Sequence, residues 1–289
     1  MPATAVGRLS LIVGNAPRSQ VAQNELADAL WGRLRLEAKE AYRKAPMLAP
    51  LFVDSILNQP SFEAAIFHRI ATRLHNNIVG LGVMVDAFNR AVDEVPDIAD
   101  ALRADIAAVV DRDPACVRFI EPFLYFKGFH AIQTHRLANW LWSSGERDFA
   151  LYLQSRSSDV FQTDIHPAVT MGRGVFLDHA TGLVVGETAV IEDNVSMLQG
   201  VTLGGTGKES GDRHPKIRRG AMIGAGAKVL GNIEIGANAR VAAGSIVLRS
   251  VAPNTTVAGV PSRVVRTSND SEANETIEQI LIGAYDYSI

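Results

Sequence analysis

The sequence predicts an α+β protein: an all-helical N-terminal domain, then a left-handed parallel β-helix with an inserted loop, then a flexible C-terminal tail. The main observation is a six-residue pattern from Ile165 to Val247, in which an aliphatic residue opens each hexapeptide. This periodicity is typical of a parallel β-helix, because about three short strands make one triangular coil and successive coils stack. The second observation is a change of period, since residues 23–158 carry their apolar residues at helical spacing.

The helical part is divided by proline breakers and by residues suited to helix caps. The apolar face of the first helix is formed by Ala27, Leu30, Trp31, Leu34 and Ala38. Pro46 and Pro50 should end this helix. Further helices are expected from a Ser61 cap to about Asn76, from an Asp97 cap onward, and over 128–142 and 148–158.

The hexapeptides define the core of the β-helix. The opening aliphatic residues should point into the prism on every face, and they are Ile165, Met171, Leu177, Val185, Ile191, Met197, Leu203, Ile217, Ile223, Val229, Ile235, Val241 and Val247. The register slips by two residues between Leu177 and Val185. Most of the 24 glycines lie in this part of the chain, as expected where corners need positive φ or close backbone approach.

An insertion in the repeat and a C-terminal tail complete the expected organisation of the chain. Residues 204–216 form a polar, glycine-rich excursion between coils, and such insertions often carry a binding site in a solenoid. The tail is polar over 267–276 but ends in an apolar segment. We therefore expect a mobile N-terminus (1–22), a helical domain (23–160), a β-helix (161–265) and a tail (266–289).

Composition excludes several classes of protein. The chain has 289 residues, 47% of them hydrophobic, and a net charge of −3, so no basic excess indicates nucleic acid as a partner. No segment approaches the ~20 apolar residues that span a bilayer, and no convincing signal peptide begins the chain. The only cysteine is Cys116, which excludes an intrachain disulfide and predicts a cytoplasmic location.

Polar residues that could carry chemistry gather in three places: near Asp164 and His166, at Asp178-His179, and at Arg213-His214. Asp164 and His179 are fifteen residues apart, close to one coil, so they could lie near each other. A carboxylate bound to a histidine fixes its tautomer and stabilises the imidazolium, which suits deprotonation of an alcohol. The simpler interpretation is that these residues are exposed corners.

These segments together resemble the serine O-acetyltransferases of the hexapeptide acyltransferase superfamily. The resemblance covers about residues 30–265, helical domain included. The matching stretches are Phe-Leu-Tyr-Phe-Lys-Gly-Phe-His-Ala (123–131), Asp-Ile-His-Pro (164–167), Leu-Asp-His-Ala-Thr-Gly-Leu-Val-Val-Gly-Glu-Thr-Ala-Val-Ile (177–191), Gly-Val-Thr-Leu-Gly-Gly-Thr-Gly-Lys (200–208), Gly-Asp-Arg-His-Pro-Lys-Ile (211–217) and Ala-Gly-Val-Pro-Ser-Arg (258–263).

The resemblance implies transfer of an acetyl group from acetyl-CoA to the hydroxyl of L-serine, giving O-acetylserine and CoA in the first step of cysteine biosynthesis. It implies that His179 is the general base, that Asp164 orients it, and that the hydroxyl attacks the thioester directly. It places Asp113 and Asp178 at the substrate ammonium, whereas local pattern alone makes Asp113 a helix stop before a proline. Arg213 should hold the carboxylate, and His214 should line the same pocket.

The resemblance also implies where the co-substrate and other chains lie. Acetyl-CoA should occupy the groove between neighbouring β-helices, near Gly205, Ala225 and Ala243, with Arg263 as a phosphate partner. A groove between chains requires oligomers, and the family forms trimers through the β-helix and usually hexamers, as dimers of trimers, through the helical domain. No metal is expected.

The tail has an implied role of its own. Family members insert a C-terminal isoleucine into the active site of O-acetylserine sulfhydrylase, and this chain ends at Ile289, although Tyr287-Ser288 departs from the familiar tails. Feedback inhibition by L-cysteine, which can occupy the serine pocket, is also implied.

Three other hypotheses stay open. The enzyme could acetylate another small acceptor, such as a sugar or a homoserine-like amino acid, although a neutral sugar needs neither Arg213 nor Asp178. It could bind zinc through His166, His179 and His214, as γ-type carbonic anhydrases bind zinc through three histidines. It could also be a non-enzymatic scaffold that docks its tail in a partner.

Overall fold

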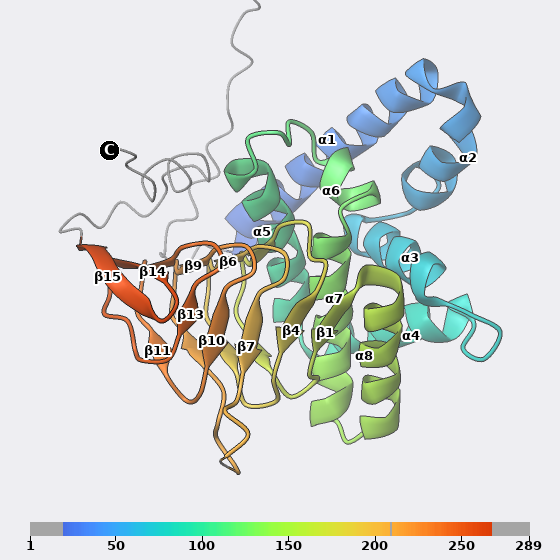
Figure 1. Cartoon of the computed structure of the whole chain (residues 1–289). Coiled ribbons are helices and arrows are strands. Elements are labelled where there is room, and N and C mark those ends of the chain that lie inside the picture. The colour runs from blue at the N-terminus through green and yellow to red at the C-terminus, as the bar shows by residue number, and fades with distance from the viewer. Residues whose placement is uncertain (1–19, 209, 268–289) are drawn as a thin grey trace, which may run out of the picture.

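The computed structural model describes residues 20–208 and 210–267, and it confirms a helical region followed by a parallel β-helix (Figure 1). Residues 1–19 of the predicted mobile N-terminus (1–22) lie outside the described residues, and residues 20–22 already belong to the first helix. The tail beyond residue 267 also lies outside the described residues. Within the described ranges, no helix is long and apolar enough to cross a membrane.

The helical region has eight α-helices and two short turns of other helix types in its described part. They are α1 (Gln20–Lys44), a 3-10 turn (Pro46–Leu48), α2 (Ala49–Phe52), a π-helical turn (Val53–Leu57), α3 (Phe62–Leu74), α4 (Leu81–Glu94), α5 (Asp97–Arg112), α6 (Ile120–Leu124), α7 (Lys127–Ser143) and α8 (Arg147–Phe161). The helices predicted over 128–142 and 148–158 correspond to α7 and α8, and α4 was not predicted.

The two predicted caps have different outcomes. The prediction for Ser61 is confirmed, because its hydroxyl accepts the N–H of Ala64 at 3.2 Å at the start of α3. The prediction for Asp97 is wrong, since Pro96 is the N-cap of α5 and Asp97 is already its first helical residue. A carboxylate at this position still favours the helix start through the helix dipole.

The β-helix has three faces, each a stack of short parallel strands. Face A contains β1 (Thr163–Ile165), β4 (Leu183–Val185), β7 (Thr202–Gly204), β10 (Lys228–Leu230) and β13 (Ile246–Val247). Face B contains β2 (Thr170–Met171), β5 (Val190–Ile191), β8 (Lys216–Ile217) and β11 (Glu234–Ile235). Face C contains β3 (Phe176–Leu177), β6 (Ser196–Met197), β9 (Met222–Ile223), β12 (Arg240–Val241), β14 (Thr255–Gly259) and the antiparallel β15 (Ser262–Thr267).

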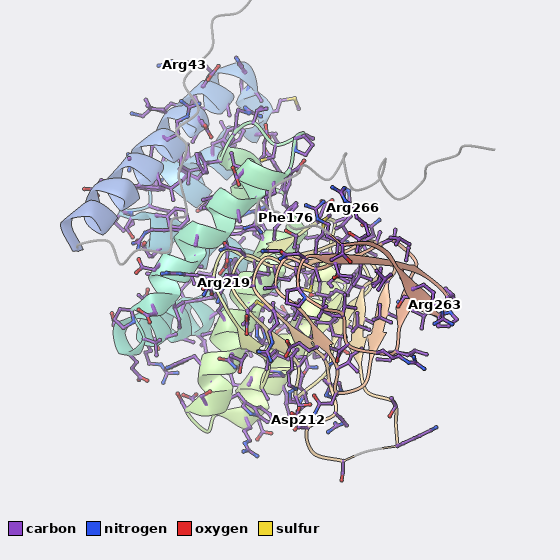
Figure 2. The ribbon with its side chains drawn as sticks, turned by 90° about the vertical axis from the view of Figure 1, so that its left-hand side faces the viewer. Arg43, Phe176, Asp212, Arg219, Arg263 and Arg266 are labelled. Carbon is purple, nitrogen blue, oxygen red and sulfur yellow. The ribbon has the colours of Figure 1, made fainter. Side chains whose placement is uncertain are left out.

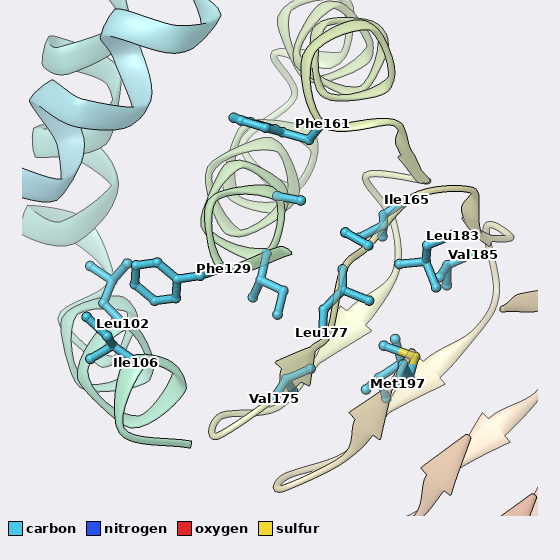
Figure 3. Close-up of a cluster of buried hydrophobic side chains, with 14 of the residues drawn as sticks. Leu102, Ile106, Phe129, Phe161, Ile165, Val175, Leu177, Leu183, Val185 and Met197 are labelled. Carbon is cyan, nitrogen blue, oxygen red and sulfur yellow. The ribbon is translucent and has the colours of Figure 1, made fainter. Parts of the chain in front are cut away.

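The predicted ladder of aliphatic residues fills the prism. All of them are buried except Met171, which is partly buried at the first coil. The same apolar core continues into the helices, where Leu102, Ile106 and Phe129 lie in one cluster with Val175 and Leu177 (Figure 3). The helical region is therefore packed on the first coil and closes that end of the prism.

A buried ion pair fixes this junction. The carboxylate of Asp105 on α5 accepts hydrogen bonds from Nε and Nη2 of Arg136 on α7, at 3.0 and 2.8 Å, and from the side chain of Gln133. Its second oxygen accepts the backbone N–H of Val175 in the first coil at 2.9 Å. Arg136 also donates to the carbonyl of Gly172 at 2.6 Å. One carboxylate thus joins two helices to the coil.

A second close approach involves the N-terminal end of α7. A Cβ on Gly128 would lie 2.0 Å from the carbonyl oxygen of Leu177, so only glycine allows the helix to touch β3 here. Leu177 is followed directly by Asp178 and His179, so this contact positions the turn that carries them.

Candidate active site

The predicted site residues fall on two different corners of the prism. Corner CA, which joins face C to face A, consists of residues 178–182, 198–201, 224–227 and 242–245. Corner AB, which joins face A to face B, consists of residues 166–169, 186–189, 205–215 and 231–233. Asp178 and His179 lie on corner CA, whereas Arg213 and His214 lie on corner AB. The width of face A separates the two groups within one chain.

The turn that carries His179 contains the two-residue slip of the repeat. His179 and Ala180 have φ of 54° and 64°, in the left-handed region that non-glycine residues rarely adopt. Backbone hydrogen bonds hold the turn, from Thr181 N–H to the His179 carbonyl at 2.7 Å and from Gly182 N–H to the Gln162 carbonyl at 2.8 Å. The His179 side chain is 72% exposed. Strain that the surroundings hold in place is common at functional sites.

Two carboxylates lie beside His179. Oδ2 of Asp178 is 3.5 Å from Nε2 of His179. Burial raises the pKa of Asp178, and the negative charge of nearby Asp113 raises it further, against the opposing charge of His179. Asp113 follows α5 directly, where the partly buried Arg112 donates to the carbonyl of Asn194 at 3.2 Å and so ties the helix end to the coil. A cation placed here would be attracted by both carboxylates.

The structure does not form the predicted pair of Asp164 and His179. Asp164 lies on β1, and its carboxylate accepts a hydrogen bond from Gln154 of α8 at 2.6 Å. The slip makes the first coil longer than three hexapeptides, and Val184 aligns with Asp164. His179 nevertheless lies in the turn that leads into β4, the neighbour of β1, so both residues belong to the same end of the prism.

On corner AB, the excursion brings Arg213 and His214 against residues that the sequence analysis missed. Nη2 of Arg213 lies 3.1 Å from Oε2 of Glu187, and Nδ1 of His214 lies 2.8 Å from Oγ1 of Thr188. Burial lowers the pKa of His214, and the charge of Arg213 lowers it further. Glu187 and Thr188 stand in the matching stretch 177–191, but the path of the excursion, which sets their partners, has no periodicity to indicate it.

Corner CA also offers a smooth surface beyond His179. Gly182, Gly200 and Gly226 stack there with positive φ, and a Cβ on either of the first two would lie within 3.6 Å of the next glycine's Cα. Ala225 and Ala243 continue the same corner. This backbone ridge has room for an extended ligand.

One polar atom on corner CA lacks a partner. Oε1 of Gln199 is buried and accepts no hydrogen bond from the described residues. Gln199 lies between His179 and Ala225 along the corner. It is hydrogen-bonded to the next coil, because the N–H of Gly226 donates to the Gln199 carbonyl at 2.8 Å. Because this oxygen is itself buried, it can accept an amide N–H of a ligand such as pantetheine only if the Gln199 side chain turns outward.

The other residues predicted for CoA lie elsewhere. Gly205 is on corner AB, where a Cβ would lie 3.4 Å from the Arg213 side chain. Arg263 is exposed on β15, at the end of the β-helix away from the helices (Figure 2). The residues predicted for CoA are thus divided between the two corners and the end of the prism. The residues predicted for serine are divided in the same way, with Asp178 on corner CA and Arg213 on corner AB.

A cavity of about 590 Å³ opens between α5, α7 and the first coil. It is lined by apolar residues such as Ile98 and Trp140 and by charged residues such as Asp100 and Arg173, and by none of the predicted site residues. This cavity is therefore separate from the predicted site.

The three histidines considered for zinc do not converge within one chain. His166 and His214 lie on corner AB, and His179 lies on corner CA. Among residues 20–208 and 210–267, no group of three or more His, Cys, Asp or Glu side chains could hold a metal ion.

We expect the thiol of Cys116 to be inert in the folded protein. Cys116 is buried, and burial raises its pKa to about 12, with further contributions from the charges of Glu121 and Asp113. Because the thiolate is the reactive form, alkylation by iodoacetamide at about pH 8 should be slow before unfolding and stoichiometric after it. Mass spectrometry of the intact chain checks this, and rapid labelling of the folded protein would contradict it.

Comparisons with known proteins find related sequences for both the helical region and the β-helix. Residues 30–134 match the family model "Serine acetyltransferase, N-terminal", and residues 214–249 match "Bacterial transferase hexapeptide (six repeats)". A serine acetyltransferase of Salmonella typhimurium is 46% identical over 90% of this chain and 96% of its own length.

Solved structures agree as well. Serine acetyltransferase of Brucella abortus in complex with coenzyme A is 58% identical, with a TM-score of 0.83 over 86% of this chain and 99% of that chain. A serine acetyltransferase in complex with cysteine is 50% identical, with a TM-score of 0.81 over 82% of this chain and 99% of that chain.

Proposed function

The chain belongs to the serine acetyltransferase family and transfers the acetyl group of acetyl-CoA to the hydroxyl of L-serine, and we propose that two chains together complete its active site. One observation carries this proposal: His179 and Asp178 lie on corner CA, with Asp113 near Asp178 after α5, whereas Arg213 and His214 lie on corner AB, across face A. If corner CA of one chain meets corner AB of a second, the groups that bind and deprotonate serine come together.

Face A supports this arrangement. It lies between the two corners, and it leaves Val184 40% exposed and Leu248, directly after β13, 52% exposed. A contact that repeats head to tail around a threefold axis would cover these side chains and form one site at each interface. We assign the trimer contact to the β-helix (161–265), and the hexamer contact to the helical domain (23–160).

On corner CA, the proposed site binds the amino group and activates the hydroxyl of serine. Asp113 and Asp178 attract the ammonium group. His179 accepts the hydroxyl proton, and we propose that Asp164 leaves Gln154 to orient the ring and stabilise its protonated form. As the proton moves to His179, the serine oxygen bonds to the acetyl carbon and the carbon–sulfur bond breaks. The CoA thiolate then takes the proton from His179, and CoA leaves as its thiol.

On corner AB of the second chain, Arg213 binds the serine carboxylate through its planar guanidinium. Arg213 must leave Glu187 to do so, since the two side chains are paired 3.1 Å apart in the free chain. His214 lines the same side. Acetyl-CoA supplies the activated acetyl group, and the ridge of corner CA, including Ala225, Ala243 and Gln199, fits its pantetheine arm, with Gly205 and Arg263 as further contacts.

Mixed oligomers test the shared site. His179→Ala and Arg213→Ala should each abolish most activity when expressed alone. When the two variants are coexpressed with different tags and purified as mixed oligomers, roughly a quarter of the sites would combine an intact His179 with an intact Arg213. Acetyl transfer should reappear accordingly. If both residues act within one chain, mixing restores nothing, and the proposal is wrong.

Two interactions of this enzyme extend the proposal. L-Cysteine carries the same ammonium and carboxylate groups as serine, and a related enzyme has been crystallised with cysteine, so we propose that cysteine occupies the serine pocket and inhibits. Ile289 should dock in O-acetylserine sulfhydrylase, but it lies outside the described residues. The cytoplasmic location stays a prediction.

A further inference from the structure

The hydrogen bonds of His214 determine which of its nitrogens carries the proton. Nδ1 lies 3.2 Å from the backbone nitrogen of Thr188 and 2.8 Å from the Thr188 hydroxyl. A backbone N–H can only donate, so Nδ1 must accept and must be unprotonated. In a neutral imidazole the proton then sits on Nε2, which is a hydrogen-bond donor and not a base.

The Thr188 hydroxyl contacts both the His214 ring and the backbone before it. Its oxygen accepts the backbone N–H groups of Arg213 and His214, at 3.0 and 3.1 Å. Both of its lone pairs are thereby occupied, and its single proton can be donated to Nδ1 of His214 or to the carboxylate of Asp212, which also interacts with this hydroxyl. The side chain of Thr188 thus holds the backbone at the end of the excursion, and its hydroxyl and backbone N–H together hold the His214 ring with Nδ1 as the acceptor.

Glycine on the other side of the ring leaves it little freedom. A Cβ on Gly186 would lie 2.1 Å from both Cδ2 and Nε2 of His214. The ring therefore packs directly on the backbone of the turn that also supplies Thr188. His214 is only 7% exposed, so it cannot rotate into solvent without breaking these contacts.

We propose that Thr188 is a positioning residue that holds His214 as its Nε2–H tautomer, so that His214 donates a hydrogen bond to the carboxylate of serine beside Arg213. This inference rests on the proposed function, which places His214 in the serine site. A donor next to a guanidinium complements a carboxylate, whereas an unprotonated nitrogen there would repel it.

The charged surroundings agree with a neutral ring. The groups that face His214 are Arg213, Glu187, Lys216 and His166. Burial and the charge of Arg213 lower its pKa, against the charge of Glu187. Protonation of Nδ1 would set two donors against each other at Thr188, so the same geometry keeps His214 neutral when serine binds.

Steady-state kinetics of Thr188→Val and Thr188→Ser test the role. We expect Thr188→Val to raise KM for serine about tenfold, with a smaller change in kcat and none in KM for acetyl-CoA, because it weakens one hydrogen bond to the carboxylate. Thr188→Ser keeps the hydroxyl and should stay near the wild type. Thr170→Val is the matched control, since Thr170 is exposed and its side chain makes no hydrogen bond among the described residues.

A double-mutant cycle separates positioning from general loss of structure. If Thr188 acts through His214, Thr188→Val should add little to KM in a His214→Ala background. Independent, additive losses, or a Thr188→Ser variant as impaired as Thr188→Val, would overturn the proposal. So would an unchanged serine KM in Thr188→Val.

The tautomer itself can be measured without any activity. Solid-state NMR of sedimented protein labelled with ¹⁵N-histidine should show an unprotonated Nδ1 for the signal that disappears in His214→Ala. The same state is expected in Thr188→Ser. In Thr188→Val only the longer contact with the backbone N–H still holds Nδ1, so the fraction of the Nε2–H tautomer should fall. A protonated Nδ1 in the wild type overturns the inference even if serine is acetylated. A wild type that shows the expected tautomer but does not acetylate serine contradicts the proposed function, and with it the carboxylate contact.

Discussion

Replacing His179 by alanine is expected to lower kcat for serine acetylation by about 10²–10⁴-fold, the usual contribution of a general base. Without the imidazole, nothing on corner CA is placed to take the hydroxyl proton at neutral pH, because both nearby carboxylates are proposed to face the ammonium. The fold should persist, since the His179 side chain is 72% exposed and packs in no core. CoA release from acetyl-CoA with L-serine measures the loss, and thermal unfolding checks the fold.

Two controls make this result specific. His75→Ala removes another exposed histidine, at the end of α3, and should leave CoA release unchanged. L-Homoserine in place of L-serine tests the acceptor, because its hydroxyl is one carbon farther from the ammonium and carboxylate. Full activity of His179→Ala would exclude His179 as the base, whereas equal rates with homoserine would favour the alternative of another small acceptor.

The β-helix could be predicted because its six-residue repeat is visible in the sequence. A side chain enters the prism at every sixth position, so a run from Ile165 to Val247 defines faces, coils and core without any long-range information. The helices of the N-terminal region were harder to predict. Its caps depend on local backbone geometry, as the different outcomes at Ser61 and Asp97 show, and α4 was missed.

The candidate site could be predicted only as a set of residue types. Which chain supplies each residue depends on the corner that it occupies, and the corners follow from strand register. The slip near His179 and the excursion before Arg213 both shift that register. Contacts such as Thr188 to His214 therefore join residues whose spacing follows no repeat, and only the folded chain displays them.

The largest effect on stability is expected from Asp105→Ala, which should lower the free energy of unfolding by about 3–5 kcal/mol, as for other buried pairs that lose one partner. Asp105 is fully buried, and without it the guanidinium of Arg136 and the N–H of Val175 lose their shared acceptor. Denaturant and thermal unfolding, followed by circular dichroism, measure the loss. Asp86→Ala is the matched control, because Asp86 is 76% exposed in its pair with Arg90 and should contribute at most about 1 kcal/mol.

A double substitution shows whether the buried charge or the lost volume causes the effect. Asp105→Leu combined with Arg136→Met replaces the pair by apolar groups, and it should recover much of the stability lost in Asp105→Ala, because no unpaired charge stays buried. A double variant as unstable as Asp105→Ala would instead assign the loss to the Val175 contact and to packing between helices and coil. Either way serine binding should weaken with Asp105→Ala, because Asp113 directly follows α5 and the Asp105 junction holds that helix against the coil that carries Asp178.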